Sequence, residues 1–222
     1  KSSTEALNRI GSQVPLFTTD SDAPDSNRVA YIGSSNTDAG MQAGEIAKKA
    51  LPDGGKCIGF VGLLGADNAR ERIDGMKAAL KGSKVELIDV RGDDIDMTRA
   101  KRNVEDALAA NPDIDCMVGF YSYNPPRIYE VLKDAGKLGE ISVVAFDEDP
   151  ITLGGVREGT IAGSVVQQPY EWGYEGMKLM AAYLKGDKSM VPADGLIIVP
   201  TAVINKDNVD AFSADLKAKI NG

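Results

Sequence analysis

Apolar runs of strand length alternate with helix-like segments along most of this 222-residue chain. The predicted strands are residues 15–19, 29–33, 56–62, 85–90, 115–121, 142–146 and 161–167. Helical spacing and capping residues predict helices over residues 36–51, 67–81, 97–110, 125–135 and 170–184, with Asp67 as an expected N-cap. Such alternation indicates right-handed βαβ crossovers, because parallel strands need long connections. We therefore expect an α/β fold built on doubly wound parallel sheets.

Charge and composition exclude several function classes. The net charge is −8 and the pI is about 4.7. This balance argues against duplex nucleic acid, whose affinity depends on Lys and Arg at phosphates, and against an anionic membrane surface. Histidine is absent from the sequence, which removes the commonest general base and metal ligand. We expect no nucleic-acid partner, no metal site and no cofactor.

The two cysteines, Cys57 and Cys116, are far apart in the sequence and form no redox or zinc motif. Each lies early in a predicted strand. Two interpretations remain open: a pair of small buried core residues, or a disulfide between neighbouring strands, which needs an oxidising compartment.

No nucleophile or phosphate-binding motif is present in the sequence. The segment Gly62-Leu63-Leu64-Gly65 is rich in glycine but lacks the Lys and Ser/Thr of a phosphate cradle. Glu148 and Asp149 are adjacent, and adjacent carboxylates rarely converge on one point, so they are interpreted as a solvated turn. We expect no catalytic residues and no enzymatic activity.

Polar side chains follow four predicted strands at the point where each strand ends. They occupy residues 18–22, 63–72, 121–126 and 147–149, and Gln167 adds an amide after the next strand. In an open parallel sheet, ligands bind at the carboxyl ends of the strands. These segments are therefore the candidate binding loops.

The residue types in these loops suit a polyhydroxylated ligand. A carboxylate only accepts hydrogen bonds, a guanidinium only donates and an amide does both, so together they match hydroxyl groups. Hydrogen bonds with a charged partner contribute roughly 1.5–3 kcal/mol each. Tyr121 and Tyr123 offer aromatic rings for the apolar face of a sugar.

Each candidate also has a purely structural interpretation. Asp20 and Asp147 could be helix N-caps or turn residues, and the two tyrosines could be packing residues. The sequence alone favours Arg72 as a solvated helix residue near Glu71, and it favours a surface position for Arg70. Gln167 is harder to explain in this way, because a buried amide needs hydrogen-bond partners.

The order of several short segments resembles a known family. These segments are Ile32-Gly33-Ser34-Ser35-Asn36 with Gly40 and Gly44, Ala69-Arg70-Glu71-Arg72 with Ile73-Asp74-Gly75-Met76, Ala110-Asn111-Pro112-Asp113, Val144-Ala145-Phe146-Asp147, and Gln167 before Pro169. In order and spacing they resemble the type I periplasmic sugar-binding proteins, the ribose-binding-protein group of ABC transporters.

The resemblance implies a fold of the periplasmic-binding-protein type I class, with two doubly wound parallel-sheet lobes. The first lobe would comprise residues 1–34 and 168–198, and the second residues 35–167 and 199–222. Family members begin with strands and helices that precede the segment equivalent to Lys1, so the resemblance implies a truncated first lobe. The missing N-terminal segment would then be a partner of this chain.

The resemblance also implies the site residues. Asp20 would bind hydroxyl groups from the first lobe, and Arg72, Asp147 and Gln167 from the second lobe and the hinge. Asn68 would line the pocket near Arg72. Three positions differ from the ribose binders, because Tyr121 replaces an Asn, Ser21 an Arg and Ile95 a Phe. These differences fit a sugar related to ribose, with Tyr121 stacking on it or donating its hydroxyl.

The function implied is that of the solute-binding component of a bacterial ABC sugar importer. The partners would be a monosaccharide and the membrane permease subunits, in the periplasm or another extracytoplasmic space. The alternative is the effector-binding domain of a lactose-repressor-like transcriptional regulator, which shares the fold. A flavodoxin-like enzyme is the remaining rival, and turnover of a sugar or sugar phosphate would support it.

Overall fold

The computed structural model describes residues 4–221 and divides into two compact units. Unit 1 comprises Lys1–Ser35 and Gln167–Thr201, and unit 2 comprises Asn36–Val166 and Ala202–Gly222. The chain passes between them at residues 35–36, 166–167 and 201–202. The lobe boundaries expected from the sequence, after residues 34, 167 and 198, remain a prediction.

Unit 1 is built on a small parallel sheet. Its strands β1 (Phe17–Thr19), β2 (Ala30–Gly33) and β8 (Leu196–Ile198) lie in the order β1-β2-β8. Its helices are α1 (Thr4–Gly11) and α7 (Pro169–Leu184). Ala30 and Ile32 of β2 pack on Trp172 and Leu179 of α7, because alternate residues of a strand face the same side.

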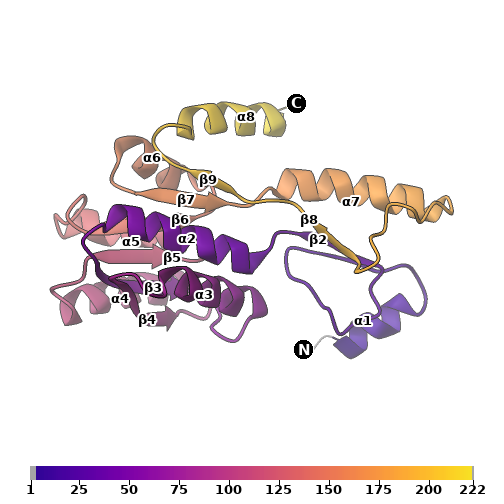
Figure 1. Cartoon of the computed structure of the whole chain (residues 1–222), viewed down its shortest axis with the longest axis horizontal. Helices are drawn as coiled ribbons and strands as arrows, with labels where there is room; N and C mark the ends of the chain where they lie inside the picture. Colours follow the sequence, from indigo (N-terminus) through magenta and orange to yellow (C-terminus); the bar gives the residue numbers. More distant parts are fainter. Residues whose placement is uncertain (1–3, 222) are drawn as a thin grey trace. The chain divides into compact units, whose positions relative to one another are not determined.

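Unit 2 carries a six-stranded sheet in the order β4-β3-β5-β6-β7-β9 (Figure 1). The strands are β3 (Gly55–Val61), β4 (Val85–Gly92), β5 (Cys116–Gly119), β6 (Ser142–Phe146), β7 (Gly163–Val166) and β9 (Ala202–Ile204). The helices are α2 (Asn36–Ala50), α3 (Asp67–Leu80), α4 (Met97–Ala110), α5 (Asn124–Asp134), α6 (Pro150–Glu158) and α8 (Val209–Asn221).

Two hydrophobic clusters cover the two faces of this sheet. On β3, Ile58 and Phe60 pack with residues of α4, α5, α6 and α8, whereas Cys57 and Val61 pack with residues of α2 and α3. The period of two along the strand separates the two sets. Both faces of the sheet are therefore buried, as expected of a doubly wound α/β layer structure.

Two sequence predictions about the elements need correction, and four elements were not predicted. The sheet of unit 2 is not entirely parallel, since β9 pairs antiparallel with β7. The elements α6, β8, β9 and α8 were not predicted individually, because β8 and β9 have only three residues each and the two helices are only weakly amphipathic. Asp67 is the first residue of α3 and not its N-cap, a position that Ala66 occupies without a side-chain hydrogen bond.

Cys57 and Cys116 are free thiols, and both are fully buried. They are register partners on the neighbouring strands β3 and β5. The hydrogen bond with Cys57, burial and nearby charge all raise the pKa of the Cys116 thiol. Both cysteines therefore belong to the core of unit 2.

Candidate functional site

The loops after three adjacent strands of unit 2, β3, β5 and β6, carry most of the predicted binding residues. In the sheet order, β4, β3, β5 and β6 are neighbours. Asn68 and Arg72 follow β3 at the start of α3, Tyr121 follows β5, and Asp147 follows β6 directly. Because the strands are parallel, these loops lie along one edge of the sheet.

Arg72 is buried and held by hydrogen bonds to two other segments of the chain. Its side chain is buried, at 3% exposure. Its Nε donates to Asn36 Oδ1 at 3.0 Å, and its Nη1 donates to the carbonyl oxygen of Phe120 at 2.7 Å. The interpretation of Arg72 as a solvated helix residue is therefore wrong, because α2 and the end of β5 cover this face of α3.

Two aromatic rings flank the Arg72 guanidinium. Its carbon lies 4.8 Å from the ring centroid of Phe146 and 5.8 Å from that of Tyr121. Cation–π contact of this kind contributes about 0.5–2 kcal/mol, more where the site is desolvated. The rings and hydrogen bonds together hold a cation at the edge of the sheet. Arg70, by contrast, lies on the surface, as the sequence indicated, and it pairs with Asp67.

Close packing of α2 on α3 sets the position of Arg72. A Cβ on Gly40 would clash with the carbonyl oxygen of Arg72, and a Cβ on Gly75 would clash with that of Thr37. Glycine at these positions lets the two helix backbones approach more closely than any side chain would allow. The glycine spacing in the sequence is therefore part of the site, because it places Arg72 against Asn36.

Tyr121 and Asn68 contact each other across two loops. The Tyr121 hydroxyl donates to Asn68 Oδ1 at 3.0 Å, and the Tyr121 backbone N–H donates to Asn124 Oδ1 at 3.1 Å. Both Tyr121 and Asn68 are partly exposed. A phenol and an amide are thus held next to the Arg72 guanidinium, where all three can meet a polar ligand.

Asp147 has a left-handed backbone, with φ at 64°. Its N–H donates to the Val165 carbonyl at 2.9 Å, and its carbonyl accepts from Ser164 Oγ at 2.7 Å. Residues with side chains adopt this conformation at a cost, and it concentrates at functional positions. The N-cap of α6 is Asp149, whose side chain accepts from Ile151 N at 2.8 Å, so the capping interpretation of Asp147 is wrong.

Glu148, which follows Asp147 in the sequence, is half-buried. Burial raises the pKa of the Glu148 carboxyl, and the charge of Asp147 raises it further. The interpretation of Glu148 and Asp149 as a solvated turn holds only in part, since both are partly exposed but Glu148 is partly desolvated and Asp149 caps α6.

In unit 1, Asp20 repeats the geometry of Asp147. It follows β1 directly, its φ is also 64°, and its carbonyl accepts from the Tyr31 hydroxyl at 2.8 Å. Ser21 is exposed beside it, whereas Gln167 is buried at 8% exposure. Each unit therefore presents an aspartate in the same unusual conformation at the end of a strand.

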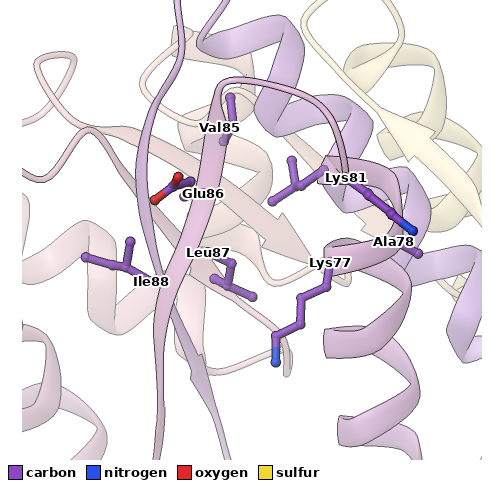
Figure 2. Close-up of a pocket in the computed structure, with 8 residues that line it drawn as sticks. Lys77, Ala78, Lys81, Val85, Glu86, Leu87 and Ile88 are labelled. Atoms are coloured by element: carbon purple, nitrogen blue, oxygen red, sulfur yellow. The ribbon is translucent and has the colours of Figure 1, made fainter.

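A hollow of about 440 Å³ lies at the carboxyl ends of β3 and β4, beside these loops. It is lined by Leu63, Leu64, Gly65, Ala66, Gly92 and Asp94. A second hollow, of about 500 Å³, lies between the end of α3 and the start of β4 (Figure 2). Its lining includes Lys77, Lys81 and Ile88. Neither lining contains a predicted site residue, but the first hollow is lined by the loop after β3 that leads to Asn68 and Arg72.

Among residues 4–221, no group of three or more Cys, Asp or Glu side chains is arranged to hold a metal ion. No helix in the same range is both long and apolar enough to cross a bilayer.

Comparison with known proteins decides the family. The sequence matches the family described as "Periplasmic binding protein domain" over residues 1–188. The chain belongs to this family. Its two units and their doubly wound sheets are those of the type I class within it.

Among related proteins of this family is the ribose import binding protein RbsB of Salmonella typhimurium. It is 28% identical over 189 residues, which cover 84% of this chain and 64% of that protein. The chain thus spans less than two thirds of the length of that relative.

Solved structures agree in fold. The glucose-galactose binding protein GanP from Geobacillus stearothermophilus is 28% identical with a TM-score of 0.86, covering 92% of this chain and 72% of that one. An ABC transporter solute-binding protein from Burkholderia graminis, solved with D-arabinose, is 32% identical with a TM-score of 0.85 and the same coverage.

Sequence reasoning missed three contributors to this family member's candidate site. Asn36 accepts from Arg72, Phe146 stacks on Arg72, and Asp93 is a buried carboxylate behind the tyrosines. Asn36 and Phe146 lie inside the segments that carry the family resemblance, so their position in those segments was a signal. Asp93 follows β4 in an acidic stretch that reads as a solvated loop, and nothing local marks it as buried.

Proposed function

We propose that this chain is the monosaccharide-binding component of a bacterial ABC sugar importer. The observation that carries the proposal is the Arg72 guanidinium, buried and held beside two aromatic rings at the carboxyl ends of the strands. Such a group donates several hydrogen bonds in fixed directions, and the adjoining Tyr121 ring, which is partly exposed, can cover the C–H face of a sugar.

In this proposal each side chain binds the sugar according to its hydrogen-bonding chemistry. Arg72 donates to sugar hydroxyl groups and Asp147 accepts from them. Tyr121 and Asn68 can each donate and accept. Asp20, Ser21 and Gln167 of unit 1 supply further acceptors and donors. Each hydrogen bond with a charged partner contributes roughly 1.5–3 kcal/mol, so a few of them suffice for micromolar affinity or better.

The relatives support a sugar ligand, since their names and complexes refer to ribose, glucose or galactose, and D-arabinose. Tyr121 and Ser21 differ from the residues expected in a ribose binder. We therefore propose a monosaccharide related to ribose, with the Tyr121 ring and hydroxyl selecting among candidates. The same relatives favour the solute-binding function over that of a transcriptional regulator.

The proposed mechanism is hinge closure. Sugar would bind to one lobe first, and rotation at the three chain crossings would bring the second lobe over it. Closure would exclude water from the site and so strengthen each hydrogen bond to the sugar. Membrane permease subunits would then recognise the closed form on the extracytoplasmic side. No bond is made or broken in this mechanism.

A thermal-shift screen against aldopentoses, aldohexoses and ketohexoses tests the proposal. A ligand that binds only the folded protein raises the midpoint by an amount that grows with concentration over Kd. We expect at least one monosaccharide to raise it and calorimetry to give a single site. Absence of binding across the whole panel would contradict the proposal.

Two neighbouring arginines provide a matched pair of variants. Arg72→Ala removes the buried guanidinium, so we expect a loss of sugar affinity of roughly a hundredfold or more. Arg70→Ala lies two residues away, on the exposed face of the same helix, and should change affinity less than about twofold. The reverse result would show that the wrong arginine has been assigned.

A further inference from the structure

Asp93 is a carboxylate with no exposed surface at the end of β4. Its Oδ1 accepts from the Tyr123 hydroxyl at 2.6 Å and from the Ile95 N–H at 2.9 Å, and its Oδ2 accepts from Asn124 Nδ2 at 2.9 Å. Within residues 4–221 it forms no ion pair with Lys or Arg. Three neutral donors thus satisfy a buried negative charge.

Asp93 also ties together the ends of three neighbouring strands. Its backbone N–H donates to Val61 O at 3.0 Å, at the end of β3. Its side chain reaches Tyr123 and Asn124, which follow β5, while Ile95 lies in its own loop after β4. The side chain of Asp93 therefore joins the loops after β4 and β5, and its backbone N–H joins them to the end of β3.

The connection from Asp93 to Tyr121 runs by two short routes. Asn124 donates to Asp93 and accepts from the Tyr121 backbone N–H at 3.1 Å. The Tyr123 ring meets the Tyr121 ring edge to face, with centroids 6.3 Å apart. Both rings lie against Gly62, where a Cβ would come within 2.7 Å of Tyr121 Cε2 and 2.8 Å of the Tyr123 hydroxyl.

Stability alone gives little reason for a carboxylate at this position. Burying a charge costs free energy, and a well-packed neutral side chain is often as stable. A carboxylate differs from an amide in that both of its oxygens accept. An asparagine at position 93 would place an NH₂ group against one of the donors, so only a carboxylate satisfies Tyr123, Asn124 and Ile95 together.

We propose that Asp93 is a positioning residue that sets the place of the Tyr121 hydroxyl through Asn124 and Tyr123, and thereby strengthens sugar binding. This inference rests on the proposed function. Asp93 itself acts through its neighbours. Loss of its acceptor geometry lets Tyr121 move and weakens the contact with Asn68.

A double-mutant cycle on sugar affinity tests the inference. We expect Asp93→Asn to lower affinity about tenfold and Tyr121→Phe to lower it by a similar factor. If Asp93 acts through Tyr121, the double variant should bind within about twofold of Tyr121→Phe alone. Effects that multiply, or an Asp93→Asn affinity equal to wild type, would overturn the inference.

Asp89→Asn is the matched control, since Asp89 lies on β4, the strand that Asp93 follows, but is exposed and paired with Arg91. Asp89→Asn should leave sugar affinity unchanged.

The milder Tyr123→Phe variant removes one hydroxyl donor and keeps the ring, so it provides the same test if Asp93→Asn does not fold. We expect it to lower affinity about threefold, again with no further loss in the Tyr121→Phe background. Unchanged affinity in Tyr123→Phe would count against the inference.

A readout without sugar separates this inference from the proposed function. In protein labelled with ¹³C on its tyrosine rings, Asp93→Asn or Tyr123→Phe should shift the Tyr121 resonances and leave those of the exposed Tyr170 and Tyr174 in place. Unchanged Tyr121 resonances would overturn the positioning inference whether or not any sugar binds. If the resonances shift but no sugar binds the wild type, the proposed function fails and the link from Asp93 to Tyr121 stands.

Discussion

Asp147 and Asp20 show how a single residue can combine an unfavourable backbone with a useful side chain. Each adopts φ of 64° directly after a strand, where glycine would be less strained. Aspartate tolerates this conformation better than most residues with side chains, and it also offers an acceptor. We interpret the strain as the cost of presenting a carboxylate at a strand end in each unit.

The first prediction uses this strain. Asp147→Gly removes the carboxylate but suits the left-handed backbone. Relief of strain stabilises the folded state, and the greater freedom of glycine stabilises the unfolded chain, so the two effects on the free energy of unfolding should nearly cancel. We expect the free energy of unfolding to stay within about 1 kcal/mol of wild type, while sugar affinity falls by roughly a hundredfold. Denaturant titration and calorimetry measure the two quantities separately.

Asp149→Ala serves as the control for Asp147→Gly. It removes the N-cap of α6 and should lower the free energy of unfolding by about 1 kcal/mol with affinity unchanged. Loss of affinity in Asp149→Ala alone would reverse the assignment of the two aspartates.

The second prediction concerns alkaline pH. Burial, followed by the hydrogen bond to Asp93, raises the pKa of the Tyr123 phenol above its ordinary value of 10.0. The folded state therefore favours the protonated phenol, and the resulting stability is complete below pH 10. It is lost as the pH rises above 10, because the unfolded chain then ionises first.

Denaturant titrations at pH 8 and at successive values above pH 10 measure this loss. Tyr123→Phe has no phenol to ionise, so its stability should decline less over that range than the wild type's. An equal decline in both proteins would show that the phenol of Tyr123 does not contribute.

At the scale of elements, the packing of α2 on α3 governs the site more than either helix does alone. Gly40 and Gly75 lie where the two backbones meet, and this contact brings Asn36 of α2 to the Arg72 guanidinium of α3. The local sequence of α3 cannot reveal the contact between Arg72 and Asn36, because Asn36 lies 36 residues away in the sequence.

The third prediction therefore compares two glycines in helices. Gly40→Ala should lower the free energy of unfolding by roughly 1–3 kcal/mol, because its Cβ meets the backbone of α3, and it should also weaken sugar binding by displacing Arg72. Gly154→Ala in α6 has open space around its Cβ and should raise stability by about 0.5–1 kcal/mol, with affinity unchanged. A stabilising Gly40→Ala would refute the close-packing argument.

At the scale of the whole molecule, the chain leaves and re-enters each unit at three crossings. Such connections are short segments that can absorb a rotation without disturbing either core. Unit 2 has its own two-sided core, so we expect it to behave as a rigid body. Sugar binding would then change the relation between the units and not the fold of either one.

The fourth prediction follows from this view. Adding the sugar found in the thermal-shift screen should reduce the radius of gyration measured by small-angle X-ray scattering. Arg72→Ala at the same sugar concentration should show no reduction, because it does not bind. An unchanged radius for the wild type at saturating sugar would contradict hinge closure while leaving sugar binding itself in place.

The sequence by itself determined the α/β class and most of the elements, because strand and helix periodicities are local properties. The helix Met97–Ala110 and the strand Ser142–Phe146 have the predicted bounds. The strand-end positions of Tyr121 and Asp147 followed from the same local pattern, since a polar residue after an apolar run marks the end of a strand.

Only the tertiary structure decided which polar residues are buried and which strand runs antiparallel. Arg72 and Arg70 have nearly the same local sequence, yet α2 covers one of them and solvent surrounds the other. Asp93 is buried because loops after β3 and β5 close over it, and β9 pairs with β7 from a distant part of the chain. Burial and pairing of this kind depend on segments remote in sequence, so no local pattern can encode them.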